Sequence, residues 1–230
     1  MLITRAEIDG TTPIDLRIAG GRIAEIGAAL TRRTGERALD AKGGALLPGL
    51  HDHHIHLMAL AVAENSTRCG PPQVRSVESL AGALRSAAEA SGWIRGVGYH
   101  ESVAGHLDRT LLDELAPDLP VRIQHRSGAM WVMNSAAVDH LGLDRGVDQP
   151  GVERDATGRA TGRLFRLDTW LRERLESGAP PSLRDVSRRM ASFGVTGLTD
   201  ATADNSSSEL RTFAAAAESG DLLQRLLVMG

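Results

Sequence analysis

The chain has 230 residues, a formal net charge of −3 and 42% hydrophobic residues, so it is long enough to bury a core as a globular protein of one or two domains. Acidic residues are mixed among the arginines throughout, and the absence of a basic stripe argues against nucleic-acid binding. No apolar stretch reaches the length of a membrane span, and the N-terminus lacks the features of a secretion signal. The single cysteine excludes an internal disulfide and suits a reducing compartment, so a cytoplasmic location is expected.

Short strands are predicted for residues 1–47. Ile14, Leu16 and Ile18 alternate with polar residues, and Gly20-Gly21 supplies a two-residue turn, which together indicate a β-hairpin. The second arm alternates less regularly, so we expect a bulge or a register irregularity in this hairpin.

From residue 45 onward, predicted strands alternate with predicted helices. Strands are expected at residues 45–50, 93–97, 121–125, 195–199 and 226–229, and helices at residues 77–90, 110–115, 134–141, 168–176, 183–193 and 207–219. Residues 59–75 are expected to form a loop, and residues 142–162 a long loop or a hairpin. Capping-box patterns begin at Ser182 and Ser206. The alternation predicts parallel βα units.

Four histidines lie within six residues in the stretch LLPGLHDHHIH, residues 46–56. On a β-strand Asp52, His54 and His56 share one face, whereas His51 and His53 point to the other. Two imidazoles at the end of one rigid strand are a good start for a divalent metal site, because neutral imidazole suits zinc and related metals.

The same stretch resembles the PGxxDxHxH signature of the amidohydrolase superfamily. Further segments are similar to the YtcJ-like branch, amidohydrolase family 3, and they occur in the same order along the chain. These segments are Trp93 to Gly98, Leu119-Pro120-Val121, Asn134 to Ala137, Thr161-Gly162 and Gly194-Val195-Thr196. The resemblance therefore extends over essentially the whole chain.

The resemblance implies an α/β fold, with a small N-terminal β-sandwich segment in residues 1–47 and the first part of a TIM-type (β/α) barrel in residues 48–230. It implies a divalent metal, with zinc favoured, bound by His54 and His56, and it gives Asp52 a supporting position beside these ligands. The implied reaction is attack of a metal-activated water on a carbon–nitrogen bond other than a peptide bond in a small-molecule substrate.

The chain departs from this family pattern in length. A complete barrel needs roughly 250 residues, and only four or five of its eight strands can be recognised here. The acid/base aspartate of the family is expected beyond Gly230, and Lys42, the sole lysine, precedes the first barrel strand and cannot bridge two metals. The sequence therefore indicates a fragment, a truncated relative, or a chain completed by another chain.

Other polar residues follow predicted strands, where barrel enzymes place their active-site groups. His100 and His125 are substrate-pocket candidates, with a solvated-loop position and a structural role as their respective alternatives. Arg126 could bind a substrate carboxylate or form an ordinary ion pair. Asp200 either lines the pocket or caps a loop.

A second function is compatible with the sequence. A partial barrel leaves strand edges and apolar helix faces open, which favours association with a second copy or a partner. The chain would then be a non-catalytic binding or assembly module, or an inactive remnant.

Overall fold

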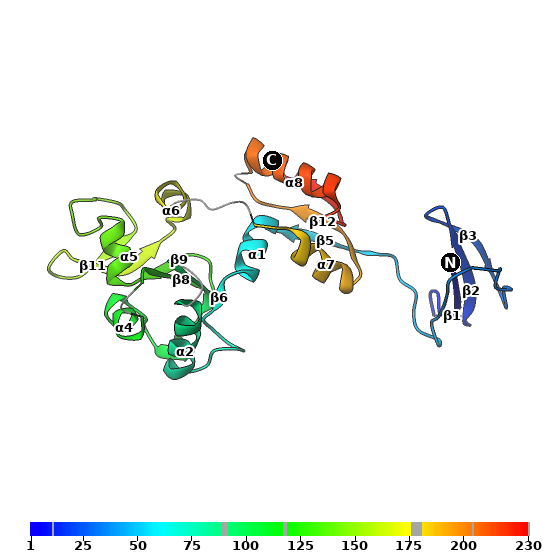
Figure 1. Ribbon diagram of the computed structural model, residues 1–230, viewed down its shortest axis with the longest axis horizontal. Helices are drawn as coiled ribbons and strands as arrows, with labels where there is room; N and C mark the ends of the chain where they lie inside the picture. The colour runs from blue at the N-terminus through cyan, green and yellow to red at the C-terminus, as the bar shows by residue number, and fades with distance from the viewer. Residues whose placement is uncertain (11, 89–91, 117–118, 176–180, 204, 230) are drawn as a thin grey trace.

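Three separate β-sheets organise the chain, as the computed structural model shows for residues 1–10, 12–88, 92–116, 119–175, 181–203 and 205–229 (Figure 1). The first sheet contains four strands from the N-terminal segment. The second contains three parallel strands that lie far apart in the sequence, and the third contains six strands from the region between them.

The N-terminal sheet has the strand order β3-β2-β1-β4. Its strands are β1 (Leu2–Ala6), β2 (Ile14–Ala19), β3 (Arg22–Gly27) and β4 (Ala38–Asp40). The predicted hairpin is confirmed as β2–β3, and the expected irregularity is a register shift between Arg17 and Ile18. The segment forms one sheet, so its β-rich character is confirmed, whereas a sandwich stays a prediction.

The parallel sheet has the order β13-β12-β5, with β5 (Leu50–Ile55), β12 (Val195–Asp200) and β13 (Arg225–Val228). The helices α1 (Leu57–Glu64), α7 (Arg184–Ser192) and α8 (Ser207–Ser219) pack against it. Their shared core includes Ile55, Leu57, Leu198 and Phe213. The carboxyl ends of β5 and β12 therefore lie beside each other.

The six-stranded sheet has the order β10-β11-β9-β8-β7-β6. Its strands are β6 (Thr67–Arg68), β7 (Ile94–Tyr99), β8 (Val121–His125), β9 (Met130–Met133), β10 (Val152–Arg154) and β11 (Ala160–Phe165). Its helices are α2 (Val77–Ala88), α3 (Glu101–Ala104), α4 (Arg109–Leu115), α5 (Ser135–His140) and α6 (Asp168–Arg174). Two hydrophobic clusters hold these helices against the sheet.

The prediction of a continuous run of parallel βα units is correct for β5, β12 and β13 and for β6, β7 and β8. It does not extend to β9, which was not expected as a strand and pairs antiparallel with β8 and β11. The antiparallel pair β10–β11 forms the hairpin that was considered for residues 142–162. Among the described strands, only β12 and β13 lie in the same sheet as β5, which carries the histidine stretch. These three strands do not close into a barrel. The mixed α/β class is confirmed, and the partial barrel stays a prediction.

Two local predictions around the histidine stretch are wrong. The buried strand expected at residues 45–50 instead starts at Leu50 and contains histidines, while Leu47 is 71% exposed. The loop expected at residues 59–75 begins with α1, whose sequence LMALAVAE is apolar nearly all round and so shows no helical periodicity.

Gly49 lies against Thr196 of β12, where a Cβ atom would clash.

Helix starts were predicted with mixed success. Ser206 and Glu209 form the expected capping box at α8. The pattern at Ser182 does not form one, because α7 begins after Leu183 without a side-chain cap. Helix α6 ends at Arg174, and the expected extension to Glu176 and its stop at Gly178 and Pro180 lie outside the described residues.

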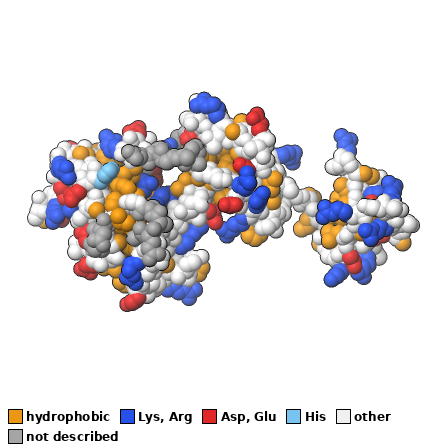
Figure 2. Space-filling view, viewed as in Figure 1, with side chains coloured by type: hydrophobic (Ala, Val, Ile, Leu, Met, Phe, Trp, Pro, Cys, Tyr) orange, Lys and Arg blue, Asp and Glu red, His pale blue; other side chains and the backbone are white. Residues whose placement is uncertain are grey.

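The N-terminal sheet stands apart from the other two sheets (Figure 1), and a narrow neck joins it to them in the space-filling view (Figure 2). Large hydrophobic side chains are exposed on it, among them Ile23 and Leu39. No helix within the described ranges is both long and apolar enough to cross a membrane.

Candidate metal and substrate site

His54 and His56 project from one face of the carboxyl end of β5. Ile55 and Leu57 alternate with them and point into the core, so the two histidines face outward and are exposed. Their ring centroids are 5.3 Å apart and the rings meet edge-on. The structure thus brings together the two residues that the sequence predicted as metal ligands.

A threonine from the neighbouring strand end contacts one of these histidines. The Nδ1 atom of His56 lies 3.0 Å from Oγ1 of Thr202, which follows β12. When Nδ1 donates its proton to this hydroxyl, the lone pair of Nε2 is left for a cation. The contact therefore fixes the orientation of the ring of a metal-ligand candidate.

Asp200 is fully buried at the end of β12, where its strand partner is Ile55, the residue between the two histidines. Its carboxylate accepts hydrogen bonds from the backbone N–H of Leu57 (2.7 Å), the backbone N–H of Thr202 (3.0 Å) and Nδ2 of Asn205 (2.9 Å). Burial opposes ionisation, but these donors outweigh it and hold the pKa of Asp200 below its usual value. The contacts are those of a loop cap, and a pocket role for Asp200 stays a prediction.

The other two histidines of the stretch form a second pair. His51 and His53 have ring centroids 4.5 Å apart, and Nε2 of His51 lies 2.8 Å from Oγ1 of Thr199. His51 also packs over Gly197 of β12, where a Cβ atom would lie 2.4 Å from its Nδ1. This pair therefore packs along the strands rather than at their ends.

His100 and His125 lie at the ends of β7 and β8, in the six-stranded sheet. Their rings stack with centroids 6.4 Å apart, and Oε2 of Glu101 lies 3.2 Å from Nε2 of His125. Each Nδ1 accepts a backbone N–H two residues ahead, from Ser102 and Ser127 respectively. The structure thus brings these two candidates together, on different strands from His54 and His56, and the Nδ1 atom of each is occupied by a local contact.

Two remaining candidates show local contacts. Arg126 is exposed and forms no ion pair within the described part of the chain, so the ion pair considered for it does not form there. Asp52 accepts the backbone N–H of His54 at 3.0 Å, which is a local contact within the histidine stretch. Its supporting role for a metal stays a prediction.

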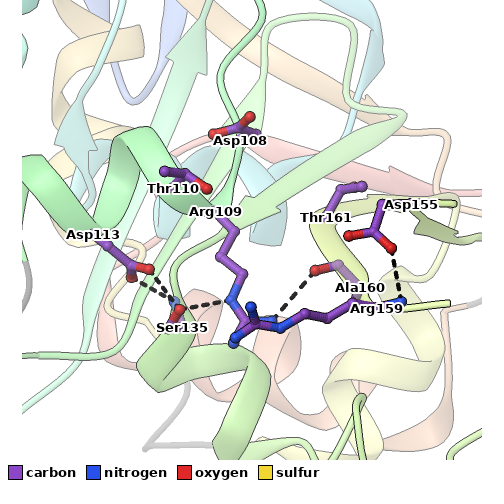
Figure 3. Close-up of a pocket in the computed structure, with 9 residues that line it drawn as sticks. All are labelled: Asp108, Arg109, Thr110, Asp113, Ser135, Asp155, Arg159, Ala160 and Thr161. Carbon is purple, nitrogen blue, oxygen red and sulfur yellow. Dashed lines mark hydrogen bonds between the residues drawn. The ribbon is translucent and has the colours of Figure 1, made fainter. Parts of the chain in front are cut away.

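A pocket of about 260 Å³ opens in the six-stranded part of the molecule (Figure 3). Arg109 crosses it, and its guanidinium donates to Oγ of Ser135 and to Asp144, both at 2.6 Å. Asp113 accepts from Ser135 at the same place. Because these charged groups pair with one another and with backbone, we interpret the pocket as a structural network.

The side chains at the strand ends offer a partial set of metal ligands. Two exposed imidazoles on one rigid strand, with one ring fixed by a threonine, fit two ligands of a divalent cation. Among the described residues no group of three or more His, Cys, Asp or Glu side chains is arranged to hold a metal. The pair therefore fits part of a metal site.

Sequence reasoning missed Thr202 and Asn205. Both follow the predicted strand that ends near Asp200, and polar residues just after a parallel strand are a recognisable signal. These residues could not be assigned to the site from the sequence, because the sequence does not show that β12 pairs directly with β5.

Two relatives illustrate what the chain is similar to. A putative amidohydrolase YtcJ from Bacillus subtilis (strain 168) is 27% identical over 136 residues, 55% of this chain and 25% of that protein. An N-substituted formamide deformylase from Arthrobacter pascens is 29% identical over 218 residues, 84% of this chain and 40% of that protein. The chain thus spans well under half the length of these curated relatives.

A solved structure supports the same fold. An uncharacterized metal-dependent hydrolase from Pyrococcus horikoshii OT3 superposes with a TM-score of 0.69 at 18% identity, covering 99% of this chain and 47% of that one. The sequence profile described as the amidohydrolase family matches residues 37–227, which confirms the resemblance inferred from the sequence. The chain belongs to the amidohydrolase family.

Proposed function

We propose that the chain supplies the first two metal ligands of a metal-dependent hydrolase that acts on a carbon–nitrogen bond other than a peptide bond. The observation that carries the proposal is the pair His54 and His56 at the end of β5, with Thr202 fixing His56. Family membership supports a hydrolase. A relative whose name states that it deformylates N-substituted formamides supports the bond type, because that reaction cleaves a C–N bond.

The residues of this chain would divide the work at the site. His54 and His56 would bind the cation, with zinc proposed because imidazole ligands suit it. A cation bound there would act as a Lewis acid toward the substrate carbonyl. Thr202 holds the His56 ring, and Asp200 fixes the turn from β5 into α1 through the N–H of Leu57.

The division of the chain is part of the proposal. Residues 1–47 would form the N-terminal β-rich unit, and residues 48–230 the first part of a hydrolase barrel whose strands include β5, β12 and β13. The six-stranded sheet would then be an insertion between two neighbouring barrel strands. We also propose that the substrate is a small molecule and that the protein is located in the cytoplasm.

Zinc binding by the purified chain tests the ligand assignment. We expect the double variant His54→Ala/His56→Ala to lower zinc affinity strongly, measured by competition with a chromophoric chelator. The matched control is His51→Ala/His53→Ala, which removes two histidines from the same strand but from the other pair. Equal loss in both variants, or no zinc binding that depends on His54 and His56, would overturn the assignment.

A non-catalytic binding module is the second candidate, favoured by one observation. The outer strand β13 leaves Leu227 61% exposed, and Met229 just after it is 56% exposed. Zinc-dependent release of amine from N-substituted formamides by the protein would exclude this candidate. Zinc binding without hydrolysis of any formamide or related amide would favour it.

A further inference from the structure

Two arginines lie side by side on one face of the six-stranded sheet. Arg95 of β7 and Arg122 of β8 are direct partners across the two strands. Both guanidinium groups lie over the ring of Trp131 in β9, with Cζ atoms 5.2 Å and 5.4 Å from the ring centroid. Trp131 therefore holds two like charges at neighbouring positions, an arrangement that is unfavourable on its own.

Neither arginine forms a direct ion pair with a carboxylate among the residues that the structure describes. The Arg95 side chain donates a hydrogen bond to Oγ of Ser66, and the Arg122 side chain makes no hydrogen bond or ion pair with any residue that the structure describes. The carboxylate of Asp168 accepts from Nε1 of Trp131 at 2.9 Å, and its charge raises the pKa of Arg95, but it forms no ion pair with either arginine among these residues. Neither guanidinium is neutralised by a direct contact.

Both side chains are also half-buried. Burial, together with the charge of Arg122, lowers the pKa of Arg95 to about 10, and burial lowers the pKa of Arg122 as well. Both groups remain charged at neutral pH. Elsewhere in the chain comparable arginines are paired, as Arg17 is with Glu36 and Arg109 is with Asp144.

We infer that Arg95 and Arg122 form a binding site for a small oxyanion, with Trp131 as its floor. Each guanidinium presents several N–H donors in its own plane, which suits the oxygens of a carboxylate or a phosphate group. An anion there would offset the repulsion between the arginines. The site is separate from the histidine pair and does not depend on metal chemistry.

An NMR titration tests this site in the full chain. The Nε–H signals of Arg95 and Arg122 are followed during addition of sodium acetate or sodium phosphate, against sodium chloride at equal ionic strength. We expect a saturable shift with acetate, phosphate or both, and the tighter of the two identifies the ligand class. A response no different from that to chloride would overturn the proposal.

Variants separate binding from packing. Arg122→Gln should weaken oxyanion binding by roughly tenfold or more, because it removes charge-assisted hydrogen bonds. The control Arg163→Gln lies in the same sheet but removes an arginine already paired with Glu153, and it should leave binding unchanged. If Arg122→Gln does not fold, Arg95→Gln serves the same purpose. Unchanged binding in a folded Arg122→Gln chain, or equal loss in both Arg122→Gln and Arg163→Gln, would show that the arginines only pack against Trp131.

Discussion

The backbone N–H of Leu57 donates a hydrogen bond of 2.7 Å to Oδ2 of Asp200, across 143 residues of sequence. This contact joins the end of β12 to the first residue of α1, directly after His56. The position of the histidine pair therefore depends on a buried carboxylate that touches neither histidine through a hydrogen bond among the described contacts.

Replacing this carboxylate should destabilise the chain. Asp200→Ala leaves the donors of Leu57, Thr202 and Asn205 without their acceptor, and we expect a loss of about 2–4 kcal/mol in the free energy of unfolding. Urea unfolding measures it. The control Asp221→Ala removes a partly exposed ion pair with Arg184 and should cost about 0–1 kcal/mol. Equal effects would contradict the assigned role of Asp200.

The threonine beside His56 should affect metal binding more than folding. Thr202→Val removes the hydroxyl that orients His56, and we expect zinc affinity to fall by about 10–100-fold, as is typical when the partner of a ligating histidine is lost. Thr202→Ser should retain it. Thr199→Val is the matched control, because that hydroxyl contacts His51 instead. A similar loss from Thr199→Val would argue against the choice of ligands.

Substitution by alanine should change the stability of the chain in opposite directions at two glycines. A Cβ atom at Gly70 would lie 1.8 Å from the backbone oxygen of Gly98, so Gly70→Ala should destabilise the chain by about 1–3 kcal/mol or more. A Cβ atom at Gly82, within α2, would meet only the end of the Arg85 side chain at 4.0 Å. Gly82→Ala should therefore stabilise the chain by up to about 1 kcal/mol. Thermal unfolding should show a lower midpoint temperature than wild type for Gly70→Ala and a higher one for Gly82→Ala.

Acid should weaken the N-terminal sheet through Glu36. The backbone N–H of Arg33 and the guanidinium of Arg17 lower the pKa of Glu36 to about 2, below the value of about 4.3 expected in the unfolded chain. Above about pH 4.3 this pKa difference adds to the free energy of unfolding, and the added stability is lost as the pH falls from about 4.3 toward 2. The stability gap between wild type and Glu36→Gln, measured in urea at several pH values, should narrow over this range. A constant gap would contradict the assignment.

Local signals in the sequence predicted local structure well. Gly20-Gly21 marks the turn of a hairpin because two positive-φ positions are needed there, and both glycines have positive φ. Ser206 with Glu209 marks a helix start, and the alternation of His54 and His56 with apolar neighbours places both histidines on one face. Each of these features depends on residues within a few positions of one another.

Long-range pairing could not be predicted in the same way. Nothing in the residues of β5 shows that its neighbour is β12 rather than β7, because the three short strands carry no signal for which of them pair. The sequence did not single out Arg95 and Arg122, because only the pairing of β7 with β8 places them together. Thr202 likewise became part of the site only through its neighbouring strand.

The placement of the six-stranded sheet between β5 and β12 has a consequence for the order of folding. Its strands pair over shorter sequence separations, whereas the contact of Leu57 with Asp200 closes a loop of 143 residues. Closing a long flexible loop costs entropy, and a loop already condensed into a sheet costs less. We expect the six-stranded sheet to form first and the β5–β12 pair afterwards, so the histidine pair gains its final geometry late in folding.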